Sequence, residues 1–549
     1  MRIRDKKALP IGLSDFKSII EENYYYVDKT DLISNLLYDG AKVNLFTRPR
    51  RFGKTLNMSM LKHFFDIENG VENRKLFENL KISDSKYMTE QGKYPVIFIS
   101  FKNLEEEDWN NCLRKIKNLI GDLYNEFEFL RKKLNKRDLK FFDSIWMEEE
   151  DVVWESALKN LTRYLYNYYG ERKVIVLIDE YDTPIIQSYQ EGYYKKAILF
   201  FKNFYGDALK DNSYLQYGVM TGILRIAKEG IFSGLNNLKA DTIFNERYSD
   251  FFGLTEKEVT KAVKYYELEY EMEEVKKWYD GYKFGEKEIY NPWSILNYLR
   301  TKELRAYWVN TSDNALIYEN LSIANMDVFN SLEKLFEGKE IKKEISPFFT
   351  FEELERYNGI WQLMVYNGYL KLNQKLEDDE YLLTIPNYEI QTFFKKGFID
   401  KYLIGSNYFN PIMRTLLEGN IEEFGRMLEE IFLINTSFHD LKGEKVYHSL
   451  FLGMLIWLRD KYEVKSNGER GHGRYDAMLI PLDKIKPAYV FEFKVSKTIK
   501  GLNAKAEEAL EQIKEKQYDA GLKEKGISKI YRIGIAFKGK NVKVKYEIV

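Results

Sequence analysis

The stretch that decides the fold is "NLFTRPRRFGKTL", residues 44–56. Gly53, Lys54 and Thr55 supply the second half of the phosphate-binding pattern G-x-x-x-x-G-K-[ST]. Arg48 stands where that pattern has its first glycine. The stretch is therefore a working nucleotide site, a degenerate one, or a chance tripeptide in a basic turn, and the surrounding sequence has to decide.

The residues on either side of this loop read as a strand followed by a helix. "AKVNLFT" (41–47) is a short apolar run, and "KTLNMSMLKHFF" (54–65) has an amphipathic helical pattern. Further continuous apolar runs occur at 94–101, 173–180 and 214–223, with helical stretches between them. Continuous apolar strands that alternate with helices indicate a buried parallel sheet. We therefore expect an α/β domain with the loop after one of its strands.

A triphosphate site also needs a carboxylate at the end of a neighbouring strand, where it can hold the metal, and an acid that polarises water. "VIVLIDEYD" (174–182) ends an apolar run with such a pair, in which Asp179 is the metal-side acid and Glu180 the general base. Either half alone often arises by chance. The two halves together, in order and on the expected elements, favour a site for ATP and Mg²⁺ in which Lys54 neutralises phosphate and Thr55 reaches the metal.

A third element follows in "VMTGILRIAK" (219–228). Thr221 ends a strand and could sense the γ-phosphate, while Arg225 just beyond it could stabilise transition-state charge. The alternative is an ordinary strand-end threonine and a surface arginine. The sequence leaves both interpretations open.

After residue 250 the pattern changes. Residues 251–335 are mainly helical, and residues 336–430 have a helix, a hairpin around an acidic turn and another helix, which suggests a winged-helix-like unit. Residues 431–549 then show a helix, three strands, a long polar helix over 502–518 and a final strand over 529–537. This α-β-β-β-α-β order indicates a further domain.

A second group of chemical side chains lies in that last region. Asp476 begins one strand, and Glu492 and Lys494 lie on one face of the next, because strand side chains repeat every two residues. Two carboxylates and a lysine suit magnesium-dependent hydrolysis of phosphodiesters. An exposed Glu–Lys pair is the plain alternative, but Asp476 on a neighbouring strand favours the metal site.

Four more residues could belong to this second group. Glu444, near the start of the preceding helix, and Gln512, on the following helix, could complete its shell. His448 and His472 are close in sequence, although His448 in an apolar helical pattern is more often part of a half-buried surface. A catalytic imidazole is therefore the minority interpretation.

The composition limits the class of protein. The net charge of −1 gives no overall basic field of the kind that indicates a nucleic-acid-binding protein, although a local cleft can still be basic. Cys112 is the only cysteine, which excludes an intrachain disulfide and a multi-cysteine zinc site. The first residues lack the apolar run of a signal peptide, and no stretch approaches 18 uninterrupted apolar residues. We expect a cytoplasmic protein that does not bind membranes.

Several of these motifs resemble those of the bacterial AAA-ATPase-like family: "YVDKT", "TRPRRFGKTL", "LIDEYDTPI", "TGILRIAKEGIFSGLNNL", "WYDGYKFG" and "YNPWSIL". The end of the chain, with "GRYDAMLIP", "FEFKVSK" and "ALEQIKEKQY", resembles the PD-(D/E)XK nuclease superfamily. The resemblance covers most of the chain and is least clear over 305–430. In this family an arginine-rich turn normally forms the first half of the phosphate loop. In the nuclease motif, Tyr475 replaces the proline and Asp476 keeps the ligand.

The resemblance implies an α/β fold with an AAA-like P-loop NTPase core (1–250), a helical lid-like region (251–335), a winged-helix-like connecting region (336–430) and a restriction-endonuclease-like domain (431–549). It implies ATP and Mg²⁺ as cofactors. The residues expected to bind ATP are Arg51, Phe52, Gly53, Lys54, Thr55, Leu56, Asp179 and Arg225. The residues expected to hold metal are Thr55, Asp179, Asp476 and Glu492, and the catalytic residues are Glu180, Asp476, Glu492 and Lys494.

We therefore expect an ATP-hydrolysing protein with a metal-dependent nuclease that acts on DNA or RNA, in defence or mobile-element biology. The alternative is an ATP-regulated nucleic-acid-binding or signalling switch whose nuclease-like domain is catalytically weak. A purely structural protein with two vestigial sites is disfavoured, because both sets of chemical groups are intact. AAA-type sites often use a neighbour's arginine, so a homo-oligomer is compatible with the sequence.

Overall fold

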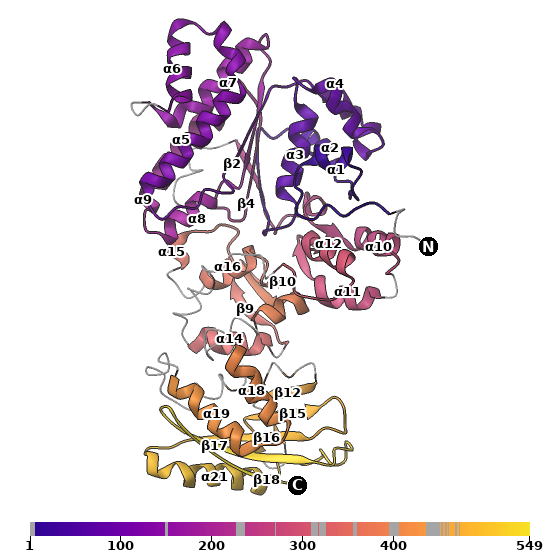
Figure 1. Cartoon of the computed structure of the whole chain (residues 1–549), viewed down its shortest axis with the longest axis vertical. Coiled ribbons are helices and arrows are strands. Elements are labelled where there is room, and N and C mark those ends of the chain that lie inside the picture. Colours follow the sequence, from indigo (N-terminus) through magenta and orange to yellow (C-terminus); the bar gives the residue numbers. More distant parts are fainter. Residues whose placement is uncertain are drawn as a thin grey trace. The chain divides into compact units, whose positions relative to one another are not determined.

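The structure is a computed structural model of the 549-residue chain, and its described residues form two compact units. One unit contains residues 1–320 and 342–389, and the other contains 321–341 and 390–549 (Figure 1). The residues that the structure describes are 6–148, 152–226, 237–268, 271–308, 317, 326–336, 338–354, 359–394, 406–434, 451, 454–455, 458, 461–466, 469–470 and 473–549.

The first unit is built on a parallel sheet, as the sequence predicts, and this sheet has five strands. The strands, in spatial order, are β2 (Val96–Ser100), β3 (Val174–Asp179), β4 (Leu215–Gly222), β1 (Val43–Thr47) and β5 (Leu238–Asp241). Every residue of β1 and β3 is buried, because helices cover both faces of the sheet. Strand β5 was not predicted, since it is only four residues long and mostly half-buried.

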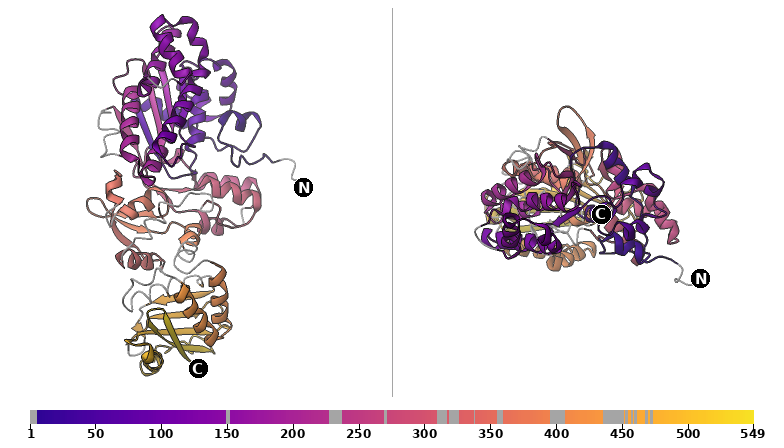
Figure 2. Two further views of the ribbon diagram at one scale, coloured as in Figure 1. Left: turned by 60° about the vertical axis from the view of Figure 1, so that its left-hand side comes forward. Right: turned by 90° about the horizontal axis from the view of Figure 1, so that it is seen from above.

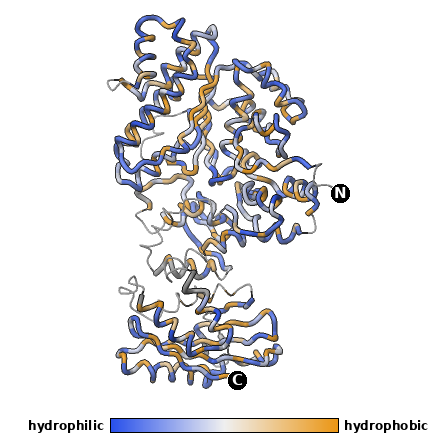
Figure 3. Tube along the Cα trace, viewed as in Figure 1, coloured by the Kyte–Doolittle hydropathy of each residue, from blue (hydrophilic) through white to orange (hydrophobic). Residues whose placement is uncertain are grey.

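Figures 1 and 2 show helices on both faces of this sheet. One face carries α1 (Phe16–Glu21), α2 (Asp31–Asp39), α3 (Lys54–Phe65) and α4 (Gly70–Asn73). The other carries α5 (Trp109–Glu126), α7 (Ala157–Tyr168), α8 (Thr183–Gln190) and α9 (Tyr194–Leu209), with α6 (Lys136–Trp146) packed on α5. The hydropathy colouring of Figure 3 shows hydrophobic residues concentrated along the strands between these layers.

The 3₁₀ helices of this unit are η2 (Arg74–Phe77), η3 (Lys81–Asp84), η4 (Lys86–Glu90), η5 (Glu128–Lys133), η6 (Trp154–Ser156) and η7 (Ser249–Phe251). No helix in the described part of the chain is both long enough and apolar enough to cross a membrane.

The same unit continues after the sheet with three helices and a small antiparallel sheet. The elements are β6 (Leu254–Thr255), α10 (Glu256–Tyr265), α11 (Met272–Tyr279), β7 (Tyr282–Phe284), β8 (Lys287–Tyr290) and α12 (Pro292–Thr301). A capping box of Thr255 and Glu258 begins α10. The β7–β8 hairpin was missed in the sequence because its strands have only three and four residues.

A second small sheet has the order β10-β11-β9. Its elements are β9 (Ile341–Glu344), α15 (Phe351–Leu354), α16 (Gly359–Tyr366), β10 (Lys371–Lys375) and β11 (Glu380–Thr384). The helix followed by a hairpin around an acidic turn is as expected from the sequence.

A buried carboxylate, Glu389, ties this region to α12. It accepts hydrogen bonds from the Ser294 hydroxyl (2.7 Å) and from the backbone N–H groups of Tyr307 (2.6 Å) and Trp308 (2.7 Å). Burial raises the pKa of Glu389 to about 7, because its charged form is removed from water. Glu389 thus joins α12 to the chain segment that follows it.

The second unit contains a mixed sheet with the order β12-β15-β16-β17-β18. The strands are β12 (Tyr462–Ser466), β15 (Ala477–Pro481), β16 (Ala488–Val495), β17 (Ile530–Lys538) and β18 (Asn541–Ile548), with the short pair β13 (Glu469–Arg470) and β14 (Gly473–Arg474) beside them. Only β16 and β17 pair in parallel. The helices are α14 (Met326–Phe336), α18 (Ser406–Leu417), α19 (Ile421–Ile434), α21 (Leu502–Glu515) and the 3₁₀ turn η11 (Ile499–Gly501).

Two features of this unit differ from the sequence-based expectation or extend beyond it. Strand β18 was not predicted, although valine and lysine alternate over residues 542–545 as they do in a strand. The expected helix over 444–460 lies mostly outside the described residues.

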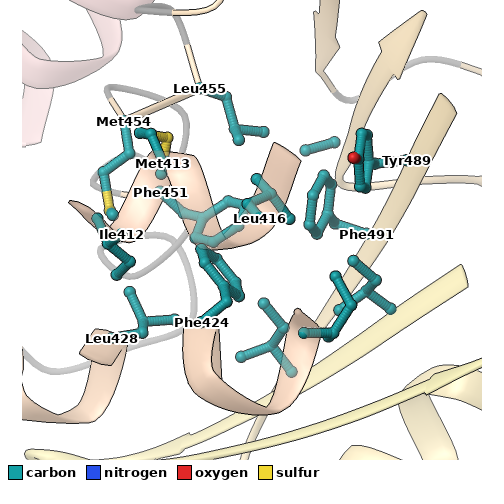
Figure 4. Close-up of a cluster of buried hydrophobic side chains, with 14 of the residues drawn as sticks. Ile412, Met413, Leu416, Phe424, Leu428, Phe451, Met454, Leu455, Tyr489 and Phe491 are labelled. Carbon is teal, nitrogen blue, oxygen red and sulfur yellow. The ribbon is translucent and has the colours of Figure 1, made fainter. Parts of the chain in front are cut away.

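The two faces of the second sheet bury different side chains. Figure 4 shows Leu416 and Phe424 of α18 and α19 packed towards Tyr489 and Phe491 of β16. On the other face α21 lies directly on β17, because a Cβ at Gly534 would be 2.4 Å from the Ala506 carbonyl oxygen. Strand β16 therefore presents its aromatic residues to one layer and its alternate residues to the side of α21.

Glu389 gives a prediction about pH. Its native pKa of about 7 lies above that of an exposed glutamate, so the native state binds the proton more tightly than the unfolded state. The contribution of Glu389 to stability is therefore complete below about pH 4.5 and is lost as the pH rises through 7, by about 3 kcal/mol. Glu389→Gln mimics the protonated acid, so its thermal midpoint should fall less than that of the wild type between pH 5 and 8. Parallel pH profiles for the two proteins would contradict this assignment.

Candidate functional site

The phosphate loop connects β1 to α3. Gly53 has φ +83°, a left-handed conformation that glycine adopts without strain, and α3 begins at the next residue. The Lys54 ammonium donates to the backbone oxygens of Arg48 and Pro49, both at 2.9 Å. An ammonium carries three donors, so these two bonds leave one for a phosphate oxygen. Burial lowers the pKa of Lys54, although the nearby carboxylates of Glu180, Asp182 and Asp179 oppose this effect.

Arg48, which replaces the first glycine of the pattern, is completely buried. Its guanidinium forms an ion pair with Asp241 of β5 (2.5 Å) and donates to the backbone oxygen of Thr47 (2.8 Å). It also lies over the rings of Phe252 and Phe284, at 5.1 and 5.2 Å. The guanidinium is thus engaged within the protein. Arg48 fastens the loop to the sheet.

The next residues of the loop contact the region around α12. Arg51, with φ +69°, lies over the ring of Trp293 at 4.4 Å. Phe52 is buried against Tyr282 and Phe284 of β7. Both residues were predicted to bind the nucleotide, and the structure gives each a packing role beside the loop.

The carboxylate of Asp179 is the centre of the site. It accepts hydrogen bonds from the hydroxyls of Thr55 (2.8 Å), Thr221 (2.5 Å) and Ser100 (3.4 Å). This meeting depends on the strand order, because β4 lies between β1 and β3 and brings Thr221 beside Asp179. The structure thus brings together Thr55, Asp179 and Thr221, which are far apart in the sequence.

Glu180 follows Asp179 in a left-handed conformation, with φ +53°. Such a backbone is unfavourable for a non-glycine residue and is often found at functional sites. Its N–H donates to the Thr221 hydroxyl (3.3 Å), and its carboxylate accepts from the Thr183 hydroxyl (3.4 Å). Glu180 is half-buried at the end of β3, where a general base would have to be.

Arg225 follows β4 and contacts residues 348 and 349. Its guanidinium is 4.3 Å from the ring centre of Phe348, and its carbonyl oxygen accepts from the N–H of Phe349 (2.9 Å). Within the described residues it has no hydrogen bond or ion pair with the group around Asp179. Its role at the nucleotide stays a prediction.

Two residues that the sequence analysis did not select hold this site together. Asp182, which is buried, accepts the N–H groups of Ile223 (2.8 Å) and Leu224 (2.7 Å), and the Tyr181 hydroxyl donates to the Leu224 carbonyl (2.6 Å). These bonds join the turn after β3 to the segment after β4. The fit is tight, because a Cβ on Gly222 would be 2.6 Å from Asp182 Oδ1. Burial raises the pKa of Asp182 to about 6. The second aspartate of "DEYD" (179–182) was the available signal.

An apolar pocket adjoins the loop. It lies between the N-terminal segment, the start of α3 and helices α10 and α12. The residues that line it are Pro10, Ile19, Tyr25, Tyr26, Val27, Lys29, Phe52, Gly53, Leu56, Asn57, Phe251, Gly253, Leu254, Ala262, Pro292, Ile295, Leu296 and Leu299. Its two polar side chains are engaged within the protein, since Lys29 pairs with Glu258 and Asn57 donates to the Phe251 carbonyl.

The second group of residues meets on the α21 side of β16. Asp476 precedes β15 and accepts the N–H of Phe493 (2.7 Å) across the strand pair. Lys494 Nζ is 3.0 Å from Glu492 Oε1, and Gln512 of α21 donates to the same oxygen. Asp476, Glu492, Lys494 and Gln512 are thus brought together as predicted.

Tyr518 also belongs to this group and was not predicted. Its hydroxyl accepts a hydrogen bond from Gln512 (3.0 Å), and burial raises its pKa. Its ring lies edge-on to Tyr475 at 6.2 Å. Tyr518 therefore positions Gln512 against Glu492. The predicted residues Glu444, His448 and His472 lie outside the described residues.

The chemistry of both groups fits magnesium. Mg²⁺ prefers oxygen ligands and keeps several waters, and the candidate ligands are the Thr55 hydroxyl with Asp179 in one site and Asp476 with Glu492 in the other. In the part of the chain that the structure describes, no group of three or more His, Cys, Asp or Glu side chains is arranged so that it could hold a metal ion by itself. Two protein oxygens with water and substrate oxygens are sufficient for Mg²⁺ but not for a structural zinc site.

Asp182 gives a prediction about stability. Asp182→Ala leaves two buried N–H groups without their acceptor, which should cost about 2 kcal/mol. Asp182→Asn keeps an acceptor oxygen in place and should cost clearly less. Thermal unfolding midpoints of the two variants test this, and equal losses would show that the hydrogen bonds to Ile223 and Leu224 do not account for the role of Asp182.

Comparison with known proteins gives a match at each end of the chain. Residues 10–232 match the family described as "Predicted AAA-ATPase", and residues 442–547 match the "PD-(D/E)XK nuclease superfamily". A relative in Azotobacter chroococcum mcd 1, described as an uncharacterized protein in the vnfD 5′ region, is 27% identical over 562 residues. That alignment covers 97% of this chain and 96% of the relative. The chain thus joins an AAA-ATPase-like domain to a C-terminal domain of the PD-(D/E)XK nuclease superfamily.

Proposed function

We propose that the protein binds and hydrolyses ATP at the phosphate loop and cuts nucleic acid at the Asp476–Glu492–Lys494 group. One observation carries the proposal: in each unit, side chains remote in sequence converge in the combination that phosphate chemistry needs. A cytoplasmic location, a homo-oligomeric state and a role in defence or mobile-element biology remain hypotheses that accompany it.

At the ATP site, each residue has a definite task. The remaining N–H of Lys54 and the backbone N–H groups at the start of α3 bind the phosphates. Thr55 and Asp179 would hold Mg²⁺, which when bound neutralises charge on the phosphates. Glu180 orients the attacking water and accepts its proton. Thr221 fixes Asp179 through its hydroxyl, and it would sense the γ-phosphate bound beside that carboxylate.

The apolar pocket would receive the base of the nucleotide, at the opposite end from the phosphates. Because it shares Gly53, Leu56 and Asn57 with the start of α3, a base attached to phosphates in the loop falls within its reach. Its walls are mostly apolar, which favours a flat heterocycle held by packing. The nucleotide would therefore contact the loop, the N-terminal segment and α12 together.

At the second site, Asp476 and Glu492 would hold Mg²⁺, which polarises the scissile phosphate when it is bound. Lys494 lies on the same face and positions the attacking water or receives its proton. Gln512, held by Tyr518, fixes the orientation of Glu492. The Phe493 N–H fixes Asp476 in the same way.

The distribution of charge supports a nucleic acid as the substrate. Residues 442–547 contain 23 Lys and Arg against 14 Asp and Glu, a net charge of +9. The other residues contain 61 Lys and Arg against 71 Asp and Glu, a net charge of −10. The near-neutral total therefore conceals a basic nuclease-like domain, which attracts a polyanion.

An alternative keeps ATP binding but makes the second domain a nucleic-acid-binding or signalling switch with weak cleavage. The observation in its favour is that Asp476 and Glu492 already accept bonds from Phe493, Lys494 and Gln512. Metal binding would have to compete with these bonds. Cleavage assays decide between the two functions.

For the ATP site, Lys54→Ala should lower ATP turnover at least about a hundredfold, because a buried cation at the phosphates is lost. Glu180→Gln should also lower turnover by about a hundredfold or more but retain ATP binding, since it removes only the base. Steady-state hydrolysis and equilibrium binding of labelled ATP measure both effects. Turnover that survives Lys54→Ala would contradict the assignment of the phosphate loop.

For the nuclease site, wild type should cut DNA or RNA in a Mg²⁺-dependent reaction, and Asp476→Ala or Lys494→Ala should abolish it. Single- and double-stranded DNA and RNA should each be tested with and without ATP. Equal cleavage by all three proteins would indicate a contaminant. Binding without cleavage by the wild type would favour the switch.

A further inference from the structure

The segment that joins α5 to α6 is unusually basic. Its sequence is "EFLRKKLNKRDLK", residues 128–140, and we call it the basic tip. It contains six Lys and Arg against two acids, while the chain outside the nuclease-like domain has a net charge of −10. Figure 1 shows the α5–α6 hairpin at the end of its unit. The tip therefore concentrates positive charge on an otherwise acidic part of the protein.

The neighbouring acids do not neutralise this charge. Asp138 is buried and already forms two hydrogen bonds with Arg163 of α7, at 2.7 and 3.0 Å. Asp143 and Glu128 are both paired with Arg131. The remaining cations are exposed and have no ion pair among the described residues: Lys132, Lys133, Lys136, Arg137 and Lys140.

Half-exposed aromatic rings lie between these cations. Lys133 Nζ is 4.4 Å from the ring centre of Tyr168, which also packs against Phe129. Arg131 lies over Trp146 at 4.6 Å. Cations interleaved with aromatic rings provide both the charge and the stacking faces that single-stranded nucleic acids use.

The local fold gives no reason for so much positive charge. Lys136 and Arg137 occupy the first turn of α6, where positive charge opposes the helix dipole. Like charges in adjacent turns also repel one another. The charges therefore destabilise the tip by itself, and an external polyanion would relieve their repulsion.

We infer that the basic tip binds the phosphate backbone of a nucleic acid, as a second contact surface in addition to the nuclease-like domain. This inference rests on the proposed function, in which nucleic acid is the substrate. The contact is independent of base sequence, because lysines and arginines on an exposed surface read phosphates and not base edges. None of the large apolar side chains of the tip is exposed, so the surface lacks the anchors that a membrane-binding helix inserts.

The test uses the full-length protein and a triple variant, Lys132→Gln, Lys133→Gln and Lys136→Gln. A matched control variant carries Lys195→Gln, Lys196→Gln and Lys202→Gln on the exposed face of α9 and has the same net charge. Fluorescein-labelled 30-nucleotide strands and 30-base-pair duplexes of DNA and RNA serve as probes, in EDTA to prevent cleavage. Fluorescence anisotropy is measured between 50 and 200 mM salt.

The tip variant should bind at least tenfold more weakly at 100 mM salt. The slope of log affinity against log salt should become shallower by about 2 to 3, since three phosphate contacts are lost. The control variant should change less than twofold. Both variants should have unfolding midpoints no lower than that of the wild type, and both should retain ATP binding, because the tip contains no residue of the ATP site.

Three results would overturn the inference. Unchanged binding by the tip variant, or equal losses in tip and control variants, removes the tip as a specific surface while leaving the proposed function intact. A wild type that binds none of the probes refutes the proposed function as well. Binding to phosphatidylserine vesicles that only the tip variant loses, with nucleic-acid binding unchanged, would assign the surface to membranes.

Discussion

The hydrogen bonds that Asp179 accepts from Thr55 and Thr221 depend on one constraint, the position of β4 between β1 and β3. This strand carries Thr221 to a position beside the end of β3. With it, a threonine hydroxyl touches the metal-side acid directly, and the same threonine accepts the N–H of Glu180. The strained backbone of Glu180 is held by this arrangement and by the bonds of Asp182 and Tyr181 beside it. These hydrogen bonds fix Asp179 and Glu180 relative to the phosphate loop.

The chemical groups were predictable because they obey local rules. Lys54 and Thr55 follow a known loop pattern, Asp179 ends a continuous apolar run, and Glu492 and Lys494 alternate on a strand. The parallel sheet was predictable for the same reason. Its buried strands are uninterrupted apolar runs.

The rest depends on contacts between distant residues, which a single sequence does not encode visibly. The partner of Arg48 is 193 residues away, on a four-residue strand. Asp182 looks like a helix cap, but its side chain makes no capping bond and instead accepts hydrogen bonds from the segment after β4. Tyr518 is one of 42 tyrosines, so only its contact with Gln512 distinguishes it. The charge of the nuclease-like domain was hidden for a different reason. The total of −1 is the sum of +9 in residues 442–547 and −10 in the rest of the chain.

The buried pair of Arg48 and Asp241 has a consequence for how this loop can evolve. Burial raises the pKa of Asp241, and the Arg48 guanidinium opposes this effect more than the other nearby cations, Lys239 and Arg247, do. Replacing Arg48 with the glycine of the common pattern would strand that acid in an apolar environment, at a cost of about 3–5 kcal/mol. A lineage could exchange the arginine for glycine only together with a neutral residue at position 241. The arginine-rich loop and the glycine loop are thus two alternative sequences, and the single substitutions that lead from one to the other are destabilising.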